Sequence, residues 1–144
     1  MSLFGTLCDT PLVLSNSSKF TIVNGVLYMA AGSLLMVWPA AVQALFFESE
    51  FTGRESSLVR ILGMTLAVIG WFYFFGGRSG ARQIVAASVI DRIVLVPLVL
   101  VPLAWSGIFP RLLVTFAILD PALGVIAWYL IAKEQPTNTS TPPG

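Results

Sequence analysis

The chain has 144 residues, of which 56% are hydrophobic and only 10% are charged, with a formal net charge of +1. This composition differs from that of a soluble globular domain and predicts a membrane protein. The small net charge argues against a general attraction to polyanions, and the absence of histidine removes the commonest catalytic base and metal ligand. A single cysteine, Cys8, excludes an intrachain disulfide. We therefore expect no metal, no cofactor and no nucleic-acid partner.

The first 19 residues are predicted to be a short lead segment that precedes the first helix. They include Asp9 and Pro11 and lack the basic start of a cleaved signal peptide. At the other end, residues 133–144 are polar and rich in proline, a composition typical of a disordered tail.

Between these ends, four long stretches contain at most one charged residue: 20–47, 61–77, 93–110 and 112–132. Each approaches or exceeds the roughly 20 apolar residues that span a bilayer as a helix. The sequence therefore predicts an all-α integral membrane protein, a single four-helix bundle over residues 20–132 with up-down-up-down topology. The four helices are expected at about 20–42, 57–77, 83–107 and 110–132.

The distribution of lysine and arginine predicts the orientation, because cytoplasmic flanks carry an excess of these residues. With four spans, five basic residues share the side of both termini, namely Lys19, Arg78, Arg82, Arg92 and Lys133. Three lie on the other side, namely Arg54, Arg60 and Arg111. We therefore expect both termini in the cytoplasm.

Glycines recur every seven residues in the first two predicted helices, at Gly25 and Gly32 and at Gly63, Gly70 and Gly77. Such spacing lets two helix backbones approach closely, which favours association in lipid. Packing within the bundle is the main interpretation, and a cavity or a dimer interface is the alternative.

Four ionisable residues lie within or near the predicted spans: Arg60, Asp91, Arg92 and Asp120. A charge at the bilayer centre costs about 2.5–3.5 kcal/mol even on insertion scales, so such groups normally face the protein interior and have a partner. If the third and fourth helices form a hairpin, Arg92 and Asp120 differ in depth by roughly 9 Å, close to the reach of the two side chains. Arg60, near the start of its helix, can instead extend to the membrane surface.

Three prolines lie within the same two helices, at positions 97, 102 and 121. Each lacks the amide that would bond the carbonyl four residues earlier, so Pro97, Pro102 and Pro121 predict helix bends and free carbonyl groups. Two interpretations of the polar cluster remain open. Arg92 and Asp120 form a packing pair that fixes helix register, or they line a pocket or relay for a lipid, a quinone or a proton.

The order of three segments resembles the small four-helix membrane proteins grouped as DoxX-like. These segments are RILGMTLAVIGWFYF at 60–74, DRIVLVP at 91–97 and AILDPALG at 117–124. The resemblance implies a four-helix membrane fold in which an arginine opens the second helix, another lies in the third and an acid lies in the fourth, here Arg60, Arg92 and Asp120. It implies no particular activity.

No nucleophile, phosphate-binding or metal-binding motif is evident in the sequence. We therefore expect a non-enzymatic membrane component that binds a lipid-like ligand or a partner membrane protein. Its expected partners are membrane lipids, a partner membrane protein or further copies of the chain. The alternatives are a small oligomeric transporter of protons or solutes, and a lipid-modifying enzyme that uses Asp120 as acid or base.

Overall fold

The computed structural model describes residues 10–134, and all regular secondary structure in this range is helical. Four helical segments are long and apolar enough to cross a membrane: Asn16–Val37, Glu55–Arg78, Arg82–Trp105 and Pro110–Lys133. The all-α, four-helix prediction is confirmed, and the chain has the architecture of a multi-pass membrane protein. Cys8 and most of the predicted disordered tail lie outside the described residues.

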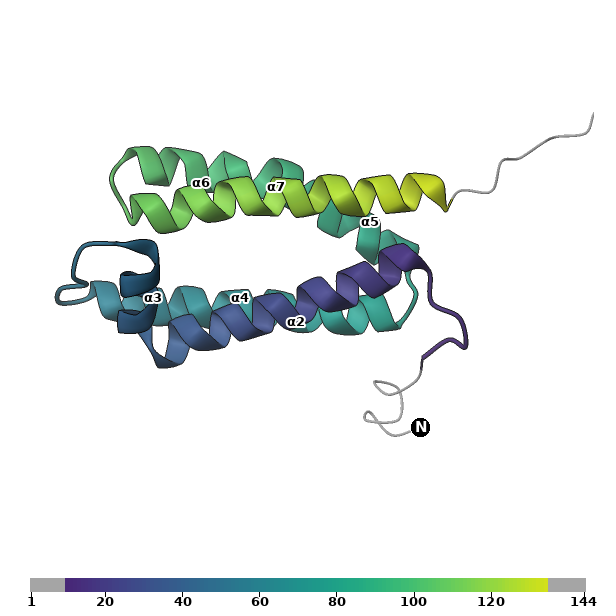
Figure 1. Cartoon of the computed structure of the whole chain (residues 1–144), viewed down its shortest axis with the longest axis horizontal. Coiled ribbons are helices and arrows are strands. Elements are labelled where there is room, and N and C mark those ends of the chain that lie inside the picture. Colours follow the sequence, from purple (N-terminus) through teal and green to yellow (C-terminus); the bar gives the residue numbers. More distant parts are fainter. Residues whose placement is uncertain (1–9, 135–144) are drawn as a thin grey trace, which may run out of the picture.

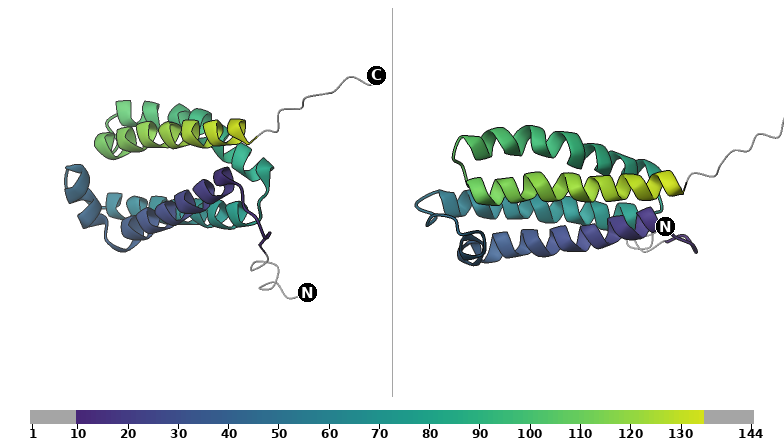
Figure 2. Two further views of the ribbon diagram at one scale, coloured as in Figure 1. Left: turned by 45° about the vertical axis from the view of Figure 1, so that its right-hand side comes forward. Right: turned by 45° about the horizontal axis from the view of Figure 1, so that its top comes forward.

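The helices form two hairpins that lie as two layers (Figure 1). The first layer contains α2 (Asn16–Val37) and α4 (Glu55–Arg78), with the short α3 (Pro39–Phe46) between them in sequence. The second layer contains α5 (Arg82–Ile90), the π-helical turn η1 (Asp91–Leu95), α6 (Val96–Trp105) and α7 (Pro110–Lys133). Successive long segments run in opposite directions, so α2 begins at the end of the molecule where α7 finishes (Figures 1 and 2).

The first span differs in its bounds from the expected 20–42. Its helix begins at Asn16, because the Ser15 side chain accepts a hydrogen bond from the amide of Ser18 and caps the helix. It ends at Val37, because Pro39 disfavours helical geometry at Trp38, whose φ and ψ are −136° and 70°. Pro39 then occupies the first turn of α3, a position that needs no amide.

The glycines at seven-residue spacing lie where α2 meets α4. A Cβ atom on Gly63 would lie 2.6 Å from the carbonyl oxygen of Gly32, and one on Gly70 would lie 2.6 Å from that of Gly25. Both neighbours are backbone atoms, so the two helices are in backbone contact at these positions. Only glycine permits this approach. The close backbone contact holds the first layer together without large side chains.

The third span changes helix type in the middle, which the sequence analysis did not anticipate. The amide of Val96 bonds the carbonyl of Asp91, five residues earlier, and the π-helical turn spans Asp91–Leu95. Pro97 follows directly and has no amide to donate to the carbonyl of Ile93, so the regular α-helical pattern is already interrupted here. The wider turn carries Asp91 and Arg92. Such π-helical turns are frequent at functional sites.

An apolar cluster fills the end of the bundle near α3. Its buried members are Leu35, Val42, Val59 and Leu112, and four phenylalanines pack against it: Phe46, Phe51, Phe109 and Phe116. Glu48 accepts a hydrogen bond of 2.7 Å from the amide of Leu112 and so caps the first turn of α7. This end of the bundle therefore contains almost no polar side chain in its interior.

Candidate functional site

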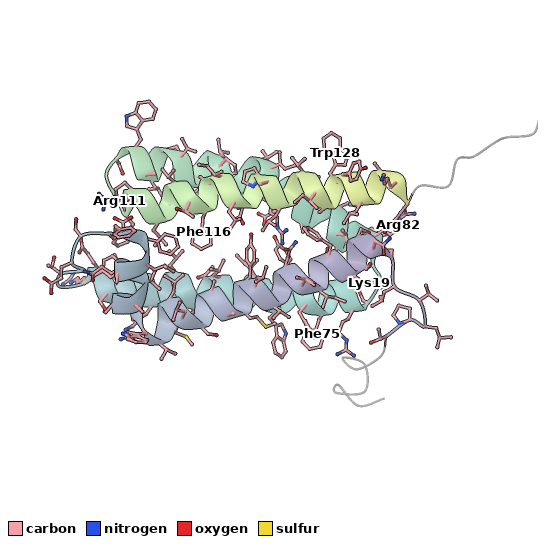
Figure 3. The ribbon with its side chains drawn as sticks, viewed as in Figure 1. Lys19, Phe75, Arg82, Arg111, Phe116 and Trp128 are labelled. Atoms are coloured by element: carbon pink, nitrogen blue, oxygen red, sulfur yellow. The ribbon has the colours of Figure 1, made fainter. Side chains whose placement is uncertain are left out.

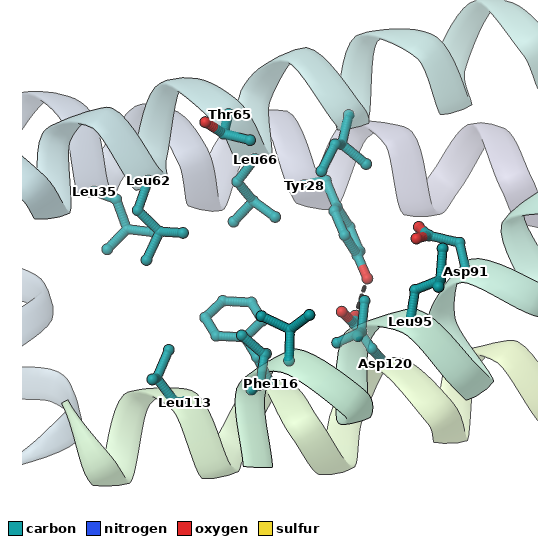
Figure 4. A pocket seen from close by; sticks show the side chains of 14 residues that line it. Tyr28, Leu35, Leu62, Thr65, Leu66, Asp91, Leu95, Leu113, Phe116 and Asp120 are labelled. Atoms are coloured by element: carbon teal, nitrogen blue, oxygen red, sulfur yellow. Dashed lines mark hydrogen bonds between the residues drawn. The ribbon is translucent and has the colours of Figure 1, made fainter. Parts of the chain in front are cut away.

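A cavity of about 360 Å³ lies between the two layers, near the middle of the bundle (Figure 4). Most of its wall is apolar and comes from α2, α4, α6 and α7, including Leu35, Leu62, Leu66, Leu113 and Phe116. In Figure 3, Phe116 points from α7 into the space between the layers, whereas Trp128 points away from it. The volume is in the range of small-molecule pockets in proteins, roughly 300–1,000 Å³.

One end of this cavity is polar. Asp120, which is only 4% exposed, accepts a hydrogen bond from the hydroxyl of Tyr28, drawn as a dashed line in Figure 4. Asp91 also lines the cavity and accepts a hydrogen bond of 2.8 Å from the hydroxyl of Tyr73. Two tyrosine–aspartate pairs from four different helical segments therefore meet here, and the tyrosine rings are in edge contact with centroids 5.5 Å apart.

Arg92 lies behind the two tyrosines and is 1% exposed. Its guanidinium carbon is 4.5 Å from the ring centroid of Tyr73 and 5.1 Å from that of Tyr28. These are cation–π contacts, and burial away from water strengthens them. Gly124 of α7 leaves space for the arginine, since a Cβ atom there would lie 3.2 Å from the Cβ of Arg92.

The direct pairing of Arg92 with Asp120, which the helix depths allow, does not occur among residues 10–134. Nε and Nη2 of Arg92 have no hydrogen-bond partner within residues 10–134, and Asp120 is held by Tyr28 instead. Helix depth predicts correctly that both residues lie in the interior. It does not determine the rotation of each helix about its axis, which decides the side-chain contacts. The ring of Tyr28 contacts the guanidinium, and its hydroxyl contacts the carboxylate.

Tyr28 and Tyr73 were missed in the sequence analysis. Both lie in apolar spans, and a buried tyrosine hydroxyl normally requires a hydrogen-bond partner. A search for polar groups other than formal charges within the spans would have identified them.

Arg60 lies outside this cluster and is exposed. Its Nη1 donates a hydrogen bond of 2.6 Å to the carbonyl oxygen of Met36, near the C-terminal end of α2. A cation is favoured at this end because the last carbonyls of a helix lack partners and carry partial negative charge. This position fits the prediction that Arg60 extends to the membrane surface. Arg60 does not belong to the buried polar cluster.

The prolines contribute unequally to the site. Pro121 is half-buried beside Asp120, and α7 remains α-helical across it. Pro102 is exposed within α6, which also continues through it. Only Pro97 stands next to a change of helix type, the π-helical turn that carries Asp91 and Arg92.

The cavity reaches the outer surface of the bundle between α4 and α6. Three of its lining residues are exposed: Thr65 on α4, Leu95 at the end of η1 and Val99 on α6. These two helices do not pack closely against each other, whereas α2 packs on α4 and α6 packs on α7. The opening therefore lies on the outer side of two candidate membrane spans, Glu55–Arg78 and Arg82–Trp105.

No group of three or more potential metal ligands occurs among the described residues. Comparison with known proteins found no matching family model, no matching curated protein and no matching solved structure. The DoxX-like resemblance therefore stays a prediction, and function must be argued from the site itself.

Proposed function

We propose that the protein binds one lipid-like molecule in the cavity, which enters sideways from the bilayer between α4 and α6. The observation that supports this proposal is an apolar cavity with one polar end and an opening on the lipid-facing side. Water is a poor occupant of a space with apolar walls. A hydrocarbon chain or ring system satisfies such walls better.

The polar end favours a particular headgroup. The charged side chains that line it are the carboxylates of Asp91 and Asp120, while Arg92 stacks behind the tyrosines. Carboxylates accept hydrogen bonds and repel anions. The ligand is therefore expected to carry a hydroxyl or amino group at its head, and not a phosphate or carboxylate.

Native mass spectrometry of the gently solubilised protein tests this proposal, with two tryptophan variants of α4. Leu66→Trp places a large ring in the cavity, and Val68→Trp places the same ring on the exposed face of the same helix. We expect the unmodified protein and Val68→Trp to carry a bound lipid, and Leu66→Trp to lose it. Equal lipid occupancy in both variants, or no lipid on any of the three proteins, would contradict the proposal.

The same spectra report partner subunits. A second copy of the chain, or a partner membrane protein, could cover the opening between α4 and α6 in place of a lipid. A dimer that dissociates on Val68→Trp or Leu66→Trp would favour this alternative. We also propose that both termini face the cytoplasm, because five basic residues share their side against three on the other.

A further inference from the structure

A line of buried polar side chains runs along one face of α2. Ser17, Thr21, Asn24 and Tyr28 follow each other at intervals of three or four residues, so they share one side of the helix. All four are at most 6% exposed, and the hydroxyl of Thr21 bonds the carbonyl of Ser17. The line covers roughly 16 Å along the axis, from the first turn of α2 to its middle.

The third span buries two polar side chains, together with Val85 and Val89 of α5. Ser88 of α5 and Arg92 of η1, four residues apart, are 3% and 1% exposed. On α7, the buried residues after Asp120 are Gly124 and Ala127, which have little or no side chain. Arg92 meets the line at Tyr28, whose ring is contacted by the guanidinium.

Glu134 lies at the outer end of the line. Its two carboxylate oxygens accept hydrogen bonds from the amide and the hydroxyl of Ser17, at 2.8 Å and 2.6 Å. Lys19 and Arg82 lie at the same end of the molecule (Figure 3). The line thus begins at a charged, polar surface beside the start of α2 and the end of α7.

Three buried donors on this line have no protein partner within the described residues: Nδ2 of Asn24, and Nε and Nη2 of Arg92. A buried donor without an acceptor is costly, and such groups in proteins are normally satisfied by ordered water. Asn24 shares its face of α2 with Thr21 and Tyr28, whose hydroxyl groups can also bond water.

The opposite half of the bundle has apolar buried side chains. Further along α2 the buried side chain is Leu35, followed by Val42 of α3, and both pack with Val59 and Leu112 at 2% exposure or less. Four phenylalanines also pack against this cluster, so the buried side chains of that half are apolar. Such a core disfavours water and ions.

From this contrast we infer that Ser17, Thr21, Asn24, Ser88 and Arg92 form a one-sided water path, which connects Asp120 to the membrane face bearing the ends of α2 and α7. Asp120 exchanges protons with the solution at that face alone. The cluster contains one guanidinium and two carboxylates in the cavity region, and uptake of one proton makes it neutral. The path supplies that proton from one face, and it does not continue to the other face of the membrane.

Water contact is tested in the unaltered protein, labelled with nitrogen-15 and reconstituted in lipid bilayers. Solid-state NMR measures the transfer of magnetisation from mobile water to individual N–H groups. We expect rapid transfer to Nδ2 of Asn24 and Nε of Arg92, and slow transfer to the backbone amides of Val59 and Leu112. Equally slow transfer at all four sites would overturn the inference, whether or not a lipid occupies the cavity.

Sidedness is tested with two cysteine variants of the third span, in a Cys8→Ser background. Ser88→Cys is nearly isosteric and lies on the path, while Ala104→Cys is similarly buried in the apolar half, at 8% against 3% exposure for the native residues. Because only a hydrated thiol forms the reactive thiolate, a membrane-impermeant thiosulfonate should modify Ser88→Cys at least about tenfold faster than Ala104→Cys. The modification should occur only from the face of the termini. Modification of Ser88→Cys from the opposite face, or no difference between the variants, would refute a one-sided path.

Discussion

Replacement of Tyr28 by phenylalanine is the most direct test of how Asp120 is held. The hydroxyl of Tyr28 supplies the hydrogen bond to Asp120, whose side chain is 4% exposed, and no other side chain among residues 10–134 donates to this carboxylate. A buried acceptor left without a donor costs about 1–3 kcal/mol. The phenylalanine ring retains the packing of Tyr28 and the stacking surface for Arg92, so the loss is confined to the hydrogen bond.

The matched control is Tyr73→Phe. It also removes a hydroxyl that bonds an aspartate, but Asp91 is only half-buried and can be hydrated after the change. We expect Tyr73→Phe to cost less than about 1 kcal/mol, near the average for hydrogen bonds between membrane helices. The free energy of unfolding is measured by titration with a denaturing detergent in mixed micelles.

A double-mutant cycle then distinguishes Tyr28 from Arg92 as the partner of Asp120. Tyr28→Phe combined with Asp120→Leu should show a coupling energy of about 1–2 kcal/mol, because each single change removes the same hydrogen bond. Arg92→Met combined with Asp120→Leu should show a smaller coupling, because their contact passes through the ring of Tyr28. If the arginine cycle gave the larger coupling, the reasoning from this geometry would be wrong.

Three further changes test other parts of the fold. Gly70→Ala would place a Cβ 2.5 Å from a backbone amide of α2, so the hairpin must open by about 0.9 Å, and unfolding titrations should show a loss of about 1–3 kcal/mol. Gly76→Ala meets only the flexible side chain of Ile84 and should cost less. Pro39→Ala should extend α2 toward α3, which amide hydrogen exchange at Ala40, in the first turn of α3, would detect as increased protection. Burial alone would raise the pKa of Glu134, but hydrogen bonds from Ser17 outweigh it and lower the pKa below its usual 4.5. The bond therefore stabilises the fold at neutral pH and is lost as the pH falls through this lowered pKa, where exchange of the Ser17 amide should accelerate.

The helical architecture was predictable because it depends on local sequence. Long stretches without charge predict membrane spans regardless of how the spans later pack, and the four segments of the structure match that prediction in number and kind. The glycines at seven-residue spacing are likewise a periodic feature of single helices. Their position at the α2–α4 contact follows from the need for close approach in lipid.

The boundary at Trp38 and the π-helical turn before Pro97 show where local reasoning was incomplete. A proline in a span predicts a bend. Its actual effect depends on whether other groups can bond the carbonyl that has lost its amide partner. At Pro39 the helix stops and a new one begins. Before Pro97 the helix forms a π-helical turn, and at Pro121 it remains α-helical.

The sequence by itself determined that Arg92 and Asp120 must lie inside the bundle, since charged groups in apolar spans are too costly to expose to lipid. Only the tertiary structure decided their partners. Asp120 bonds a tyrosine 92 positions earlier in the chain, and Arg92 contacts two aromatic rings from different helices. Such contacts depend on the rotation of each helix about its axis and on the spacing of the two layers. These are properties of the packed bundle, and no local pattern along the chain contains them.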